Sequence, residues 1–130
     1  MSFARRQQLV FLLLILAQAV HSVEEYCTKL YEVFPLTRFA SAVVSSDLAR
    51  GFLILNVAIV TIGLFCWAVP VRLGWPIARG LMWFWAILEL CNGAIHSALA
   101  LTRHGYFPGV ATAPLLLLFG GWLAVLLIRA

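Results

Sequence analysis

Charged residues are scarce in this sequence, and acidic residues are the scarcest of them. Only 11% of the 130 residues are charged, and the chain holds a single lysine, Lys29, and a single aspartate, Asp47. A typical soluble domain has about 25% charged residues, so water is not the solvent of most of this surface. The net charge of +4 comes from basic residues near the ends of apolar segments, where they set membrane topology, and we expect no nucleic-acid partner.

Paired cysteines are also missing. The three cysteines, Cys27, Cys66 and Cys91, form no CxxC motif, which is the spacing typical of zinc sites and redox motifs. Two of them lie within apolar segments, where a thiol behaves as a small hydrophobic group. The sequence therefore predicts neither a cysteine-based zinc site nor a disulfide framework.

Long apolar segments are what the sequence does contain. Hydrophobic residues make up 64% of the chain, and the mean hydropathy is +1.01. Four segments approach the roughly 20 residues that a helix needs to cross a bilayer, at about residues 7–26, 51–71, 79–101 and 107–128. A bilayer offers no water to backbone amides, and the segments lack the alternation of barrel strands. We therefore predict one all-α domain over residues 1–130, an integral membrane bundle of four transmembrane helices.

The first segment also has features of a secretory signal peptide, because Arg5 and Arg6 precede its apolar run and small residues follow it. Polar residues come directly after that run, and they match polar residues far downstream. We therefore predict that the segment is retained as the first membrane span.

The longest connection, residues 27–50, mixes apolar side chains such as Phe39 and Val43 with charged ones such as Arg38 and Asp47. Such a mixture is typical of an interfacial helix that lies on the membrane and covers one end of a bundle. A solvated linker with scattered apolar residues fits the pattern equally well.

Basic residues predict the orientation of the spans. Five arginines fall on one side without any acid, whereas four basic residues share the other side with four acids. The positive-inside rule then places both termini in the cytoplasm. We expect the cytoplasmic membrane of a prokaryote. The five arginines are Arg5, Arg6, Arg72, Arg79 and Arg129.

Two predicted spans carry clusters of ionisable residues, each of which costs roughly 2.5–3.5 kcal/mol at a span centre on insertion scales. In the first span, Glu24 and Glu25 follow His21 by three and four residues, so both carboxylates lie within reach of the imidazole. In the third span, Glu89, Asn92 and His96 share a sector of roughly 60° on the helix. Each span therefore presents a polar stripe.

The two stripes are predicted to meet. His21 lies 15 residues after Arg6, and His96 lies 17 residues after Arg79, which corresponds to about 25 Å along each helix. At that common depth, in the outer half of the bilayer, the two imidazoles can face each other inside the bundle.

Imidazoles and carboxylates at one place suit two kinds of chemistry. They can bind a divalent metal ion in the bundle core, and we predict His21, Glu24, Glu89 and His96 as its ligands, with Glu25 as a ligand or an orienting group. They also suit acid–base catalysis, because burial favours a neutral carboxylic acid and a nearby imidazole can exchange a proton with it. Asn92 is predicted to donate to a substrate or an oxyanion. The spacing does not separate the two chemistries.

A turn follows the third span, where Tyr106 comes shortly before Pro108 and Gly109. We expect Pro108 in the first turn of the fourth span, which suits its fixed φ. Tyr106 is then predicted to place its hydroxyl at the membrane interface, above the site. An aromatic residue at the start of a span is also commonplace.

Three short motifs resemble those of the HXXEE family of integral membrane proteins. HSVEE at residues 21–25 corresponds to HxxEE, NGAIH at 92–96 to NxxxH, and YFPG at 106–109 to YxPG. The resemblance implies a membrane protein, suspected to be an enzyme. Glu89 enters from helical geometry alone. The site residues that the resemblance implies are His21, Glu24, Glu25, Asn92, His96, Tyr106, Pro108 and Gly109.

The leading interpretation is a membrane-embedded enzyme that acts on a membrane lipid, an isoprenoid or another hydrophobic small molecule reaching it between helices. Hydrolysis, isomerisation and cyclisation are all open. A proton or metal-ion conduit is one alternative, but Asn56, Thr61 and Thr112 are too few to continue a relay across the membrane. A structural or partner-binding subunit, whose polar side chains bond to one another, is the other.

Overall fold

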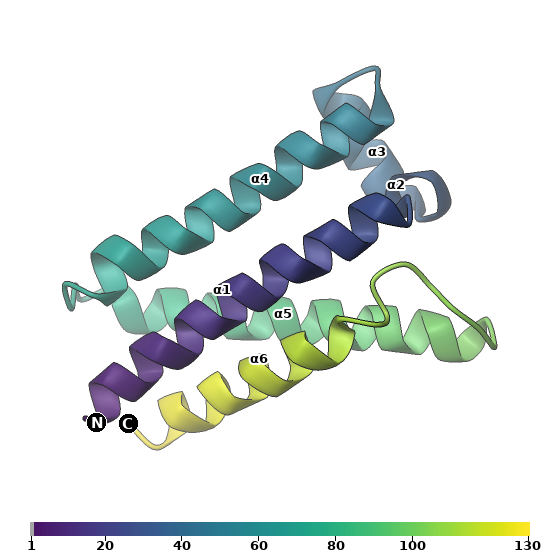
Figure 1. Ribbon diagram of the computed structural model, residues 1–130. Coiled ribbons are helices and arrows are strands. Elements are labelled where there is room, and N and C mark those ends of the chain that lie inside the picture. Colours follow the sequence, from purple (N-terminus) through teal and green to yellow (C-terminus); the bar gives the residue numbers. More distant parts are fainter. Residues whose placement is uncertain (1) are drawn as a thin grey trace.

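Helices make up all the regular secondary structure of residues 2–130, the part of the chain that this computed structural model describes. The elements are α1 (Phe3–Cys27), α2 (Leu30–Val33), α3 (Pro35–Val44), α4 (Leu48–Cys66), the π-helical turn η1 (Trp67–Val71), α5 (Ala78–Thr102) and α6 (Ala113–Ile128) (Figure 1). The predicted all-α class is confirmed. Three helical segments are long and apolar enough to cross a membrane, namely Ala4–Cys27, Leu48–Val71 and Ala78–Thr102. These segments indicate a membrane protein, whereas α6, with 16 residues, is shorter.

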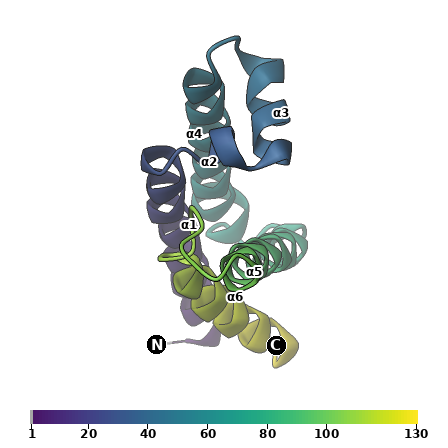
Figure 2. The ribbon, with the colours of Figure 1, turned by 90° about the vertical axis from the view of Figure 1, so that its right-hand side faces the viewer.

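Helix α1 joins two groups of helices. On one side it contacts α4, which in turn contacts α2 and α3. On the other side it contacts α6, which packs along α5. Figure 2 shows these two groups on opposite sides of α1 when the bundle is viewed from the end. Both termini lie at the same end of the bundle (Figure 1).

The end of the bundle that holds the termini is filled by apolar side chains. Phe11 and Leu14 of α1 and Leu123 and Leu127 of α6 are all 0% exposed, and they pack in one cluster with apolar residues of α5. Arg79 donates from Nη2 to the Leu127 carbonyl oxygen at 2.9 Å, which satisfies a carbonyl at the end of α6. This end of the bundle is a packed apolar core.

The connection between the first two spans is helical, which favours the interfacial helix over the linker. Pro35 occupies the first turn of α3, and Asp47 caps α4 by accepting a hydrogen bond from the Arg50 amide at 3.2 Å. Leu36, Phe39 and Val43 lie between 67% and 71% exposed at helical spacing, which is typical of a face that contacts lipid. The contact of α3 with the membrane stays a prediction.

The fourth apolar segment does not become helical where the sequence predicts. Its expected range was residues 107–128, but α6 begins at Ala113, and Pro114 rather than Pro108 occupies its first turn. The placement of Pro108 in that turn is therefore wrong. The cause is the loop before α6, in which Gly109 has a φ of +93°. A right-handed helix does not allow this φ.

Candidate metal centre

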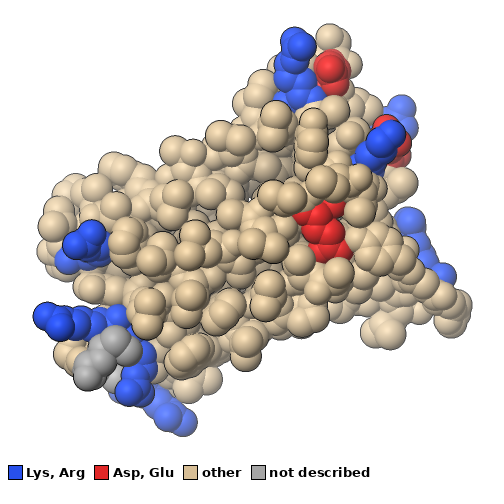
Figure 3. Space-filling view, viewed as in Figure 1, with Lys and Arg blue, Asp and Glu red and all other residues tan. Residues whose placement is uncertain are grey.

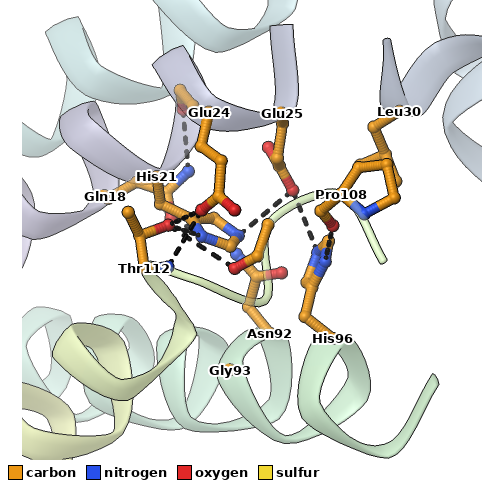
Figure 4. A network of polar contacts seen from close by, with 12 residues as sticks. Gln18, His21, Glu24, Glu25, Leu30, Asn92, Gly93, His96, Pro108 and Thr112 are labelled. Carbon is orange, nitrogen blue, oxygen red and sulfur yellow. Dashed lines mark hydrogen bonds and ion pairs between the residues drawn. The ribbon is translucent and has the colours of Figure 1, made fainter. Parts of the chain in front are cut away.

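Three side chains from α1 and α5 converge at the end of the bundle opposite the termini. Glu25 Oε1 lies 3.2 Å from His21 Nε2 and 3.0 Å from His96 Nε2. The two imidazole rings are nearly perpendicular, with centroids 4.7 Å apart. All three side chains are buried, and Figure 4 shows the Glu25 carboxylate directed toward both rings. The predicted meeting of the two polar stripes is confirmed.

Hydrogen bonds on the outer side of each ring determine which nitrogen faces the centre. His96 Nδ1 lies 2.6 Å from the Pro108 carbonyl oxygen, which can only accept, so this nitrogen carries a proton. His21 Nδ1 lies 2.7 Å from Thr112 Oγ1. The Thr112 hydroxyl donates its own proton to Glu24, so it accepts from His21. In its neutral form each imidazole therefore presents an unprotonated Nε2 toward Glu25.

With both imidazoles neutral, three acceptors meet in a buried place. Within the part of the chain that the structure describes, His21 Nε2 has no hydrogen-bond partner, although it lies next to the Glu25 carboxylate. Buried acceptors that face one another need a shared proton or a cation between them. Two ligand atoms about 2.0–2.1 Å from a tetrahedral Zn²⁺ ion are about 3.3–3.4 Å apart, a little more than the 3.2 and 3.0 Å found here, and all three potential ligand atoms lie within 4.8 Å of one another. The geometry therefore suits a divalent metal ion.

Glu24 faces a different set of partners, in the loop that joins α5 to α6. Its carboxylate accepts hydrogen bonds from the Tyr106 hydroxyl at 2.5 Å, from the amides of Ala111 at 3.0 Å and Thr112 at 2.9 Å, and from the Thr112 hydroxyl. Burial of the phenol and its bond to Glu24 raise the pKa of Tyr106, so the phenol stays protonated as a donor. Glu24 thus fixes the loop whose groups hold the two imidazoles.

Gly109 lets this loop lie directly against the imidazoles. A Cβ atom at this position would lie 2.5 Å from His96 Nδ1 and 2.7 Å from His21 Cε1, and the φ of +93° is strained for any residue with a side chain. The glycine is therefore required both by its backbone conformation and by the space beside the rings.

The site unites the three motifs found in the sequence. A family model described as "Protein of unknown function with HXXEE motif" matches residues 12–123. The chain belongs to the HXXEE family. Among curated proteins and among solved structures, none matches it. In this HXXEE protein the first motif supplies His21 and Glu25 to the centre and Glu24 to the loop. The second motif supplies His96, and the third supplies the loop whose Pro108 carbonyl orients His96.

A second polar group lies next to the centre, about two helical turns along α5 from His96. Glu89 is only 1% exposed, and Asn92 Nδ2 donates to Glu89 Oε2 and to Gln18 Oε1, both at 3.3 Å. With its NH₂ group toward Glu89, Gln18 donates to Oε2 at 2.6 Å. With its oxygen there, Gln18 accepts from a protonated Glu89. The orientation of the Gln18 amide thus determines whether it can satisfy an ionised or a protonated Glu89.

Only some of the predicted site residues belong to the potential metal-binding group. His21 and His96 meet as predicted, but the carboxylate that completes the potential metal-binding group is Glu25. Glu24 and Glu89, which the sequence favoured as further ligands, lie outside this group. Thr112 was missed as a partner of His21, although it is the one hydroxyl-bearing residue between Phe107 and Ile128. A lone hydroxyl in an apolar segment is the signal that could have found it.

Proposed function

We propose that this HXXEE protein is a membrane-embedded enzyme whose centre binds a divalent metal ion and acts on a lipid-like or isoprenoid substrate. The convergence of His21, Glu25 and His96, each ring fixed by an outer hydrogen bond, carries the proposal, because metal-ligating histidines have such outer partners. A bound metal ion supplies a Lewis acid or an activated water. Hydrolysis, isomerisation and cyclisation are reactions of the class that such a centre supports.

Each polar residue beside the centre has a separate proposed role. Glu89 is the proposed proton carrier, because it is buried in the cavity lining beside the centre and the Gln18 amide can turn to bond it with or without its proton. The Asn92 amide is the proposed donor to a substrate oxygen, through the N–H that is free when Gln18 turns its NH₂ group toward Glu89. Glu24 and Tyr106 position the loop and touch no substrate. The same centre without a metal ion, with one imidazole protonated against Glu25, would support acid–base chemistry alone.

We further propose four membrane crossings with both termini in the cytoplasm, in the cytoplasmic membrane of a prokaryote. Helix α6 has 16 residues and is about 24 Å long at 1.5 Å per residue, so the preceding loop completes its crossing. In Figure 3, basic residues without acidic ones cover the end that holds the termini, whereas both kinds are present at the other end. This distribution supports the orientation through the positive-inside rule.

The two alternatives fit the structure less well. A conduit needs polar groups across the whole bundle, but Phe11, Leu14 and Leu123 fill the interior at the end that holds the termini. A purely structural role predicts polar side chains that satisfy one another; His21 Nε2 meets this only if it is protonated and pairs with Glu25 at 3.2 Å, and the cavity beside the centre is not explained by such a role.

Metal analysis of protein purified without chelator and then supplied with Zn²⁺, Mn²⁺ or Fe²⁺ tests the proposal. We expect about one ion per chain, as for a single catalytic site, and its loss in His96→Ala. His104→Ala is the matched control, because His104 is exposed on the loop and this variant should keep the ion. A folded wild-type protein that takes up none of these ions would contradict the metal-dependent form and leave the acid–base form.

A further inference from the structure

A cavity of about 360 Å³ adjoins the candidate centre. Its volume lies within the range of about 300–1,000 Å³ that is typical of small-molecule sites. One wall is polar and comes from α1 and α5, whereas the other walls are largely apolar and come from the chain between Leu30 and Ile59 and from the outer face of α5. The polar wall consists of Gln18, Glu25, Glu89, Asn92 and His96.

The cavity opens sideways, between α4 and α5. These two helices touch at few positions, and Figure 2 shows them in the two separate groups that α1 joins. Large apolar side chains at this opening are exposed, with Ile59 at 37%, Leu88 at 41% and Ile95 at 48%. In a membrane-spanning bundle such side chains face acyl chains rather than water. A ligand can therefore reach the centre from the bilayer.

The charges of the cavity restrict the head group that it can take. The lining has two carboxylates, Glu25 and Glu89, and contains no Lys or Arg among the residues that the structure describes. Arg103 stacks on the Phe107 ring, 4.9 Å from its centroid, and is not part of the lining. A divalent ion at the centre would only offset the two carboxylates. A phosphate head would thus lack the Arg or Lys partners that commonly bind phosphates, and only a metal ion at the centre could take their place.

We propose that the cavity binds an amphiphile with an uncharged polar head, such as an alcohol, ester or amide, whose apolar chain extends into the bilayer between α4 and α5. This substrate class rests on the proposed function. The head lies beside Glu25, Glu89 and Asn92, which offer it both acceptors and a donor, and the chain lies along Leu88 and Ile95. Phosphorylated lipids and prenyl diphosphates are expected to bind more weakly, because the described lining offers them carboxylates and no Lys or Arg.

Two photoactivatable lipids with the same diazirine-bearing acyl chain test the proposal, one a monoacylglycerol and the other a lysophosphatidate. The wild-type protein is labelled in nanodiscs of neutral lipid, and labelled peptides are quantified by mass spectrometry. We expect the monoacylglycerol probe to label residues 36–40 and 88–95 about tenfold more than the lysophosphatidate, a difference of about 1.4 kcal/mol, because a buried charge without a partner is costly. Equal labelling by the two probes would overturn the proposal.

A blocking variant and a matched control test the position of the ligand's acyl chain. Ile95→Trp places a bulky ring at the opening, on a side chain already 48% exposed, and should reduce the labelling of residues 36–40. Val57→Trp is the control, because Val57 lines a separate groove of about 270 Å³ between α1 and α4 whose lining holds no carboxylate or imidazole. If Ile95→Trp leaves the labelling unchanged, the acyl chain of the probe lies elsewhere and the proposal is overturned.

Metal content, measured on the same samples, separates this inference from the proposed function. A protein that holds its metal ion but shows no preference for the uncharged probe contradicts the substrate class alone. A protein without metal that still prefers the uncharged probe supports the substrate class and contradicts only the metal-dependent form of the proposed function.

Discussion

The two ends of the bundle use the same helices for opposite purposes. At the end that holds the termini, α1, α5 and α6 bury apolar side chains such as Phe11 and Leu123. At the other end, α1 and α5 bury His21, Glu25 and Glu89 beside a cavity. We expect the packed apolar end to hold the helices together even where the polar end is altered. A second apolar cluster, of Leu30, Tyr31, Phe52 and Phe107, packs beside these polar residues, so we expect that assembly of the helices does not depend on them.

The largest expected effect comes from Glu25→Gln. The substitution removes the carboxylate oxygen that both imidazoles face, so metal affinity should fall by more than the roughly 10–100-fold that follows loss of an outer partner. Because the apolar end is untouched, the thermal midpoint of the metal-free protein should change by only a few degrees. Metal analysis and thermal unfolding in detergent check both halves. A variant that unfolds together with its metal loss would show that the polar end does hold the bundle.

A smaller effect is expected from Thr112→Val, which removes the hydroxyl between His21 and Glu24 while keeping the shape of the side chain. His21 then loses the partner that fixes its tautomer, and metal affinity should fall roughly 10–100-fold. Thr112→Ser retains the hydroxyl and is the control. Competition titrations with a chelator of known affinity measure the difference, and equal affinities of the valine and serine variants would refute the role of this hydroxyl.

The converse experiment is Leu14→Ala at the apolar end. We expect a loss of about 2 kcal/mol in unfolding free energy, at the low end for such substitutions because lipid rather than water is the reference for apolar surface. The metal content of the folded protein should not change. Unfolding measured in mixed micelles and metal analysis of the folded fraction check this. A loss of metal would mean that the two ends are coupled.

The smallest effect is expected from Tyr106→Phe. Glu24 keeps its three other donors, so removal of this hydroxyl should weaken metal binding by only about fivefold, or about 1 kcal/mol. Because burial and Glu24 raise the pKa of Tyr106, the phenol remains a donor at any pH below its ordinary value. The wild-type advantage over Tyr106→Phe should therefore be constant between neutral and mildly alkaline pH, and an advantage that vanishes there would contradict the assigned hydrogen bond.

The helices and the meeting of the two polar stripes were predictable because both depend on regular helical geometry. Hydropathy gives the apolar segments, and spacings of three, four and seven residues place His21 with Glu25, and Glu89 with His96, on single helix faces. Depth follows from counting residues at 1.5 Å each. These quantities are local to one helix and need no knowledge of how the helices pack.

The roles of the two neighbouring carboxylates were not predictable in this way. Glu24 and Glu25 lie three and four residues after His21, and both spacings bring a side chain near the imidazole. Which of them faces α5 depends on how α1 is rotated against its neighbours. The conformation of the loop before Ala113 likewise depends on its bonds to Glu24 and the imidazoles, which come from distant parts of the chain. Thr112 owes its role to the same contacts.

X-ray absorption spectroscopy of the metal-loaded protein is the most direct measurement of the central claim, that His21, Glu25 and His96 together bind a divalent ion. The account predicts scattering from two imidazoles and at least one oxygen in the wild type, and from one imidazole in His96→Ala reloaded with excess metal. A bound ion whose spectrum shows no imidazole, or one that is identical in the two proteins, would contradict it.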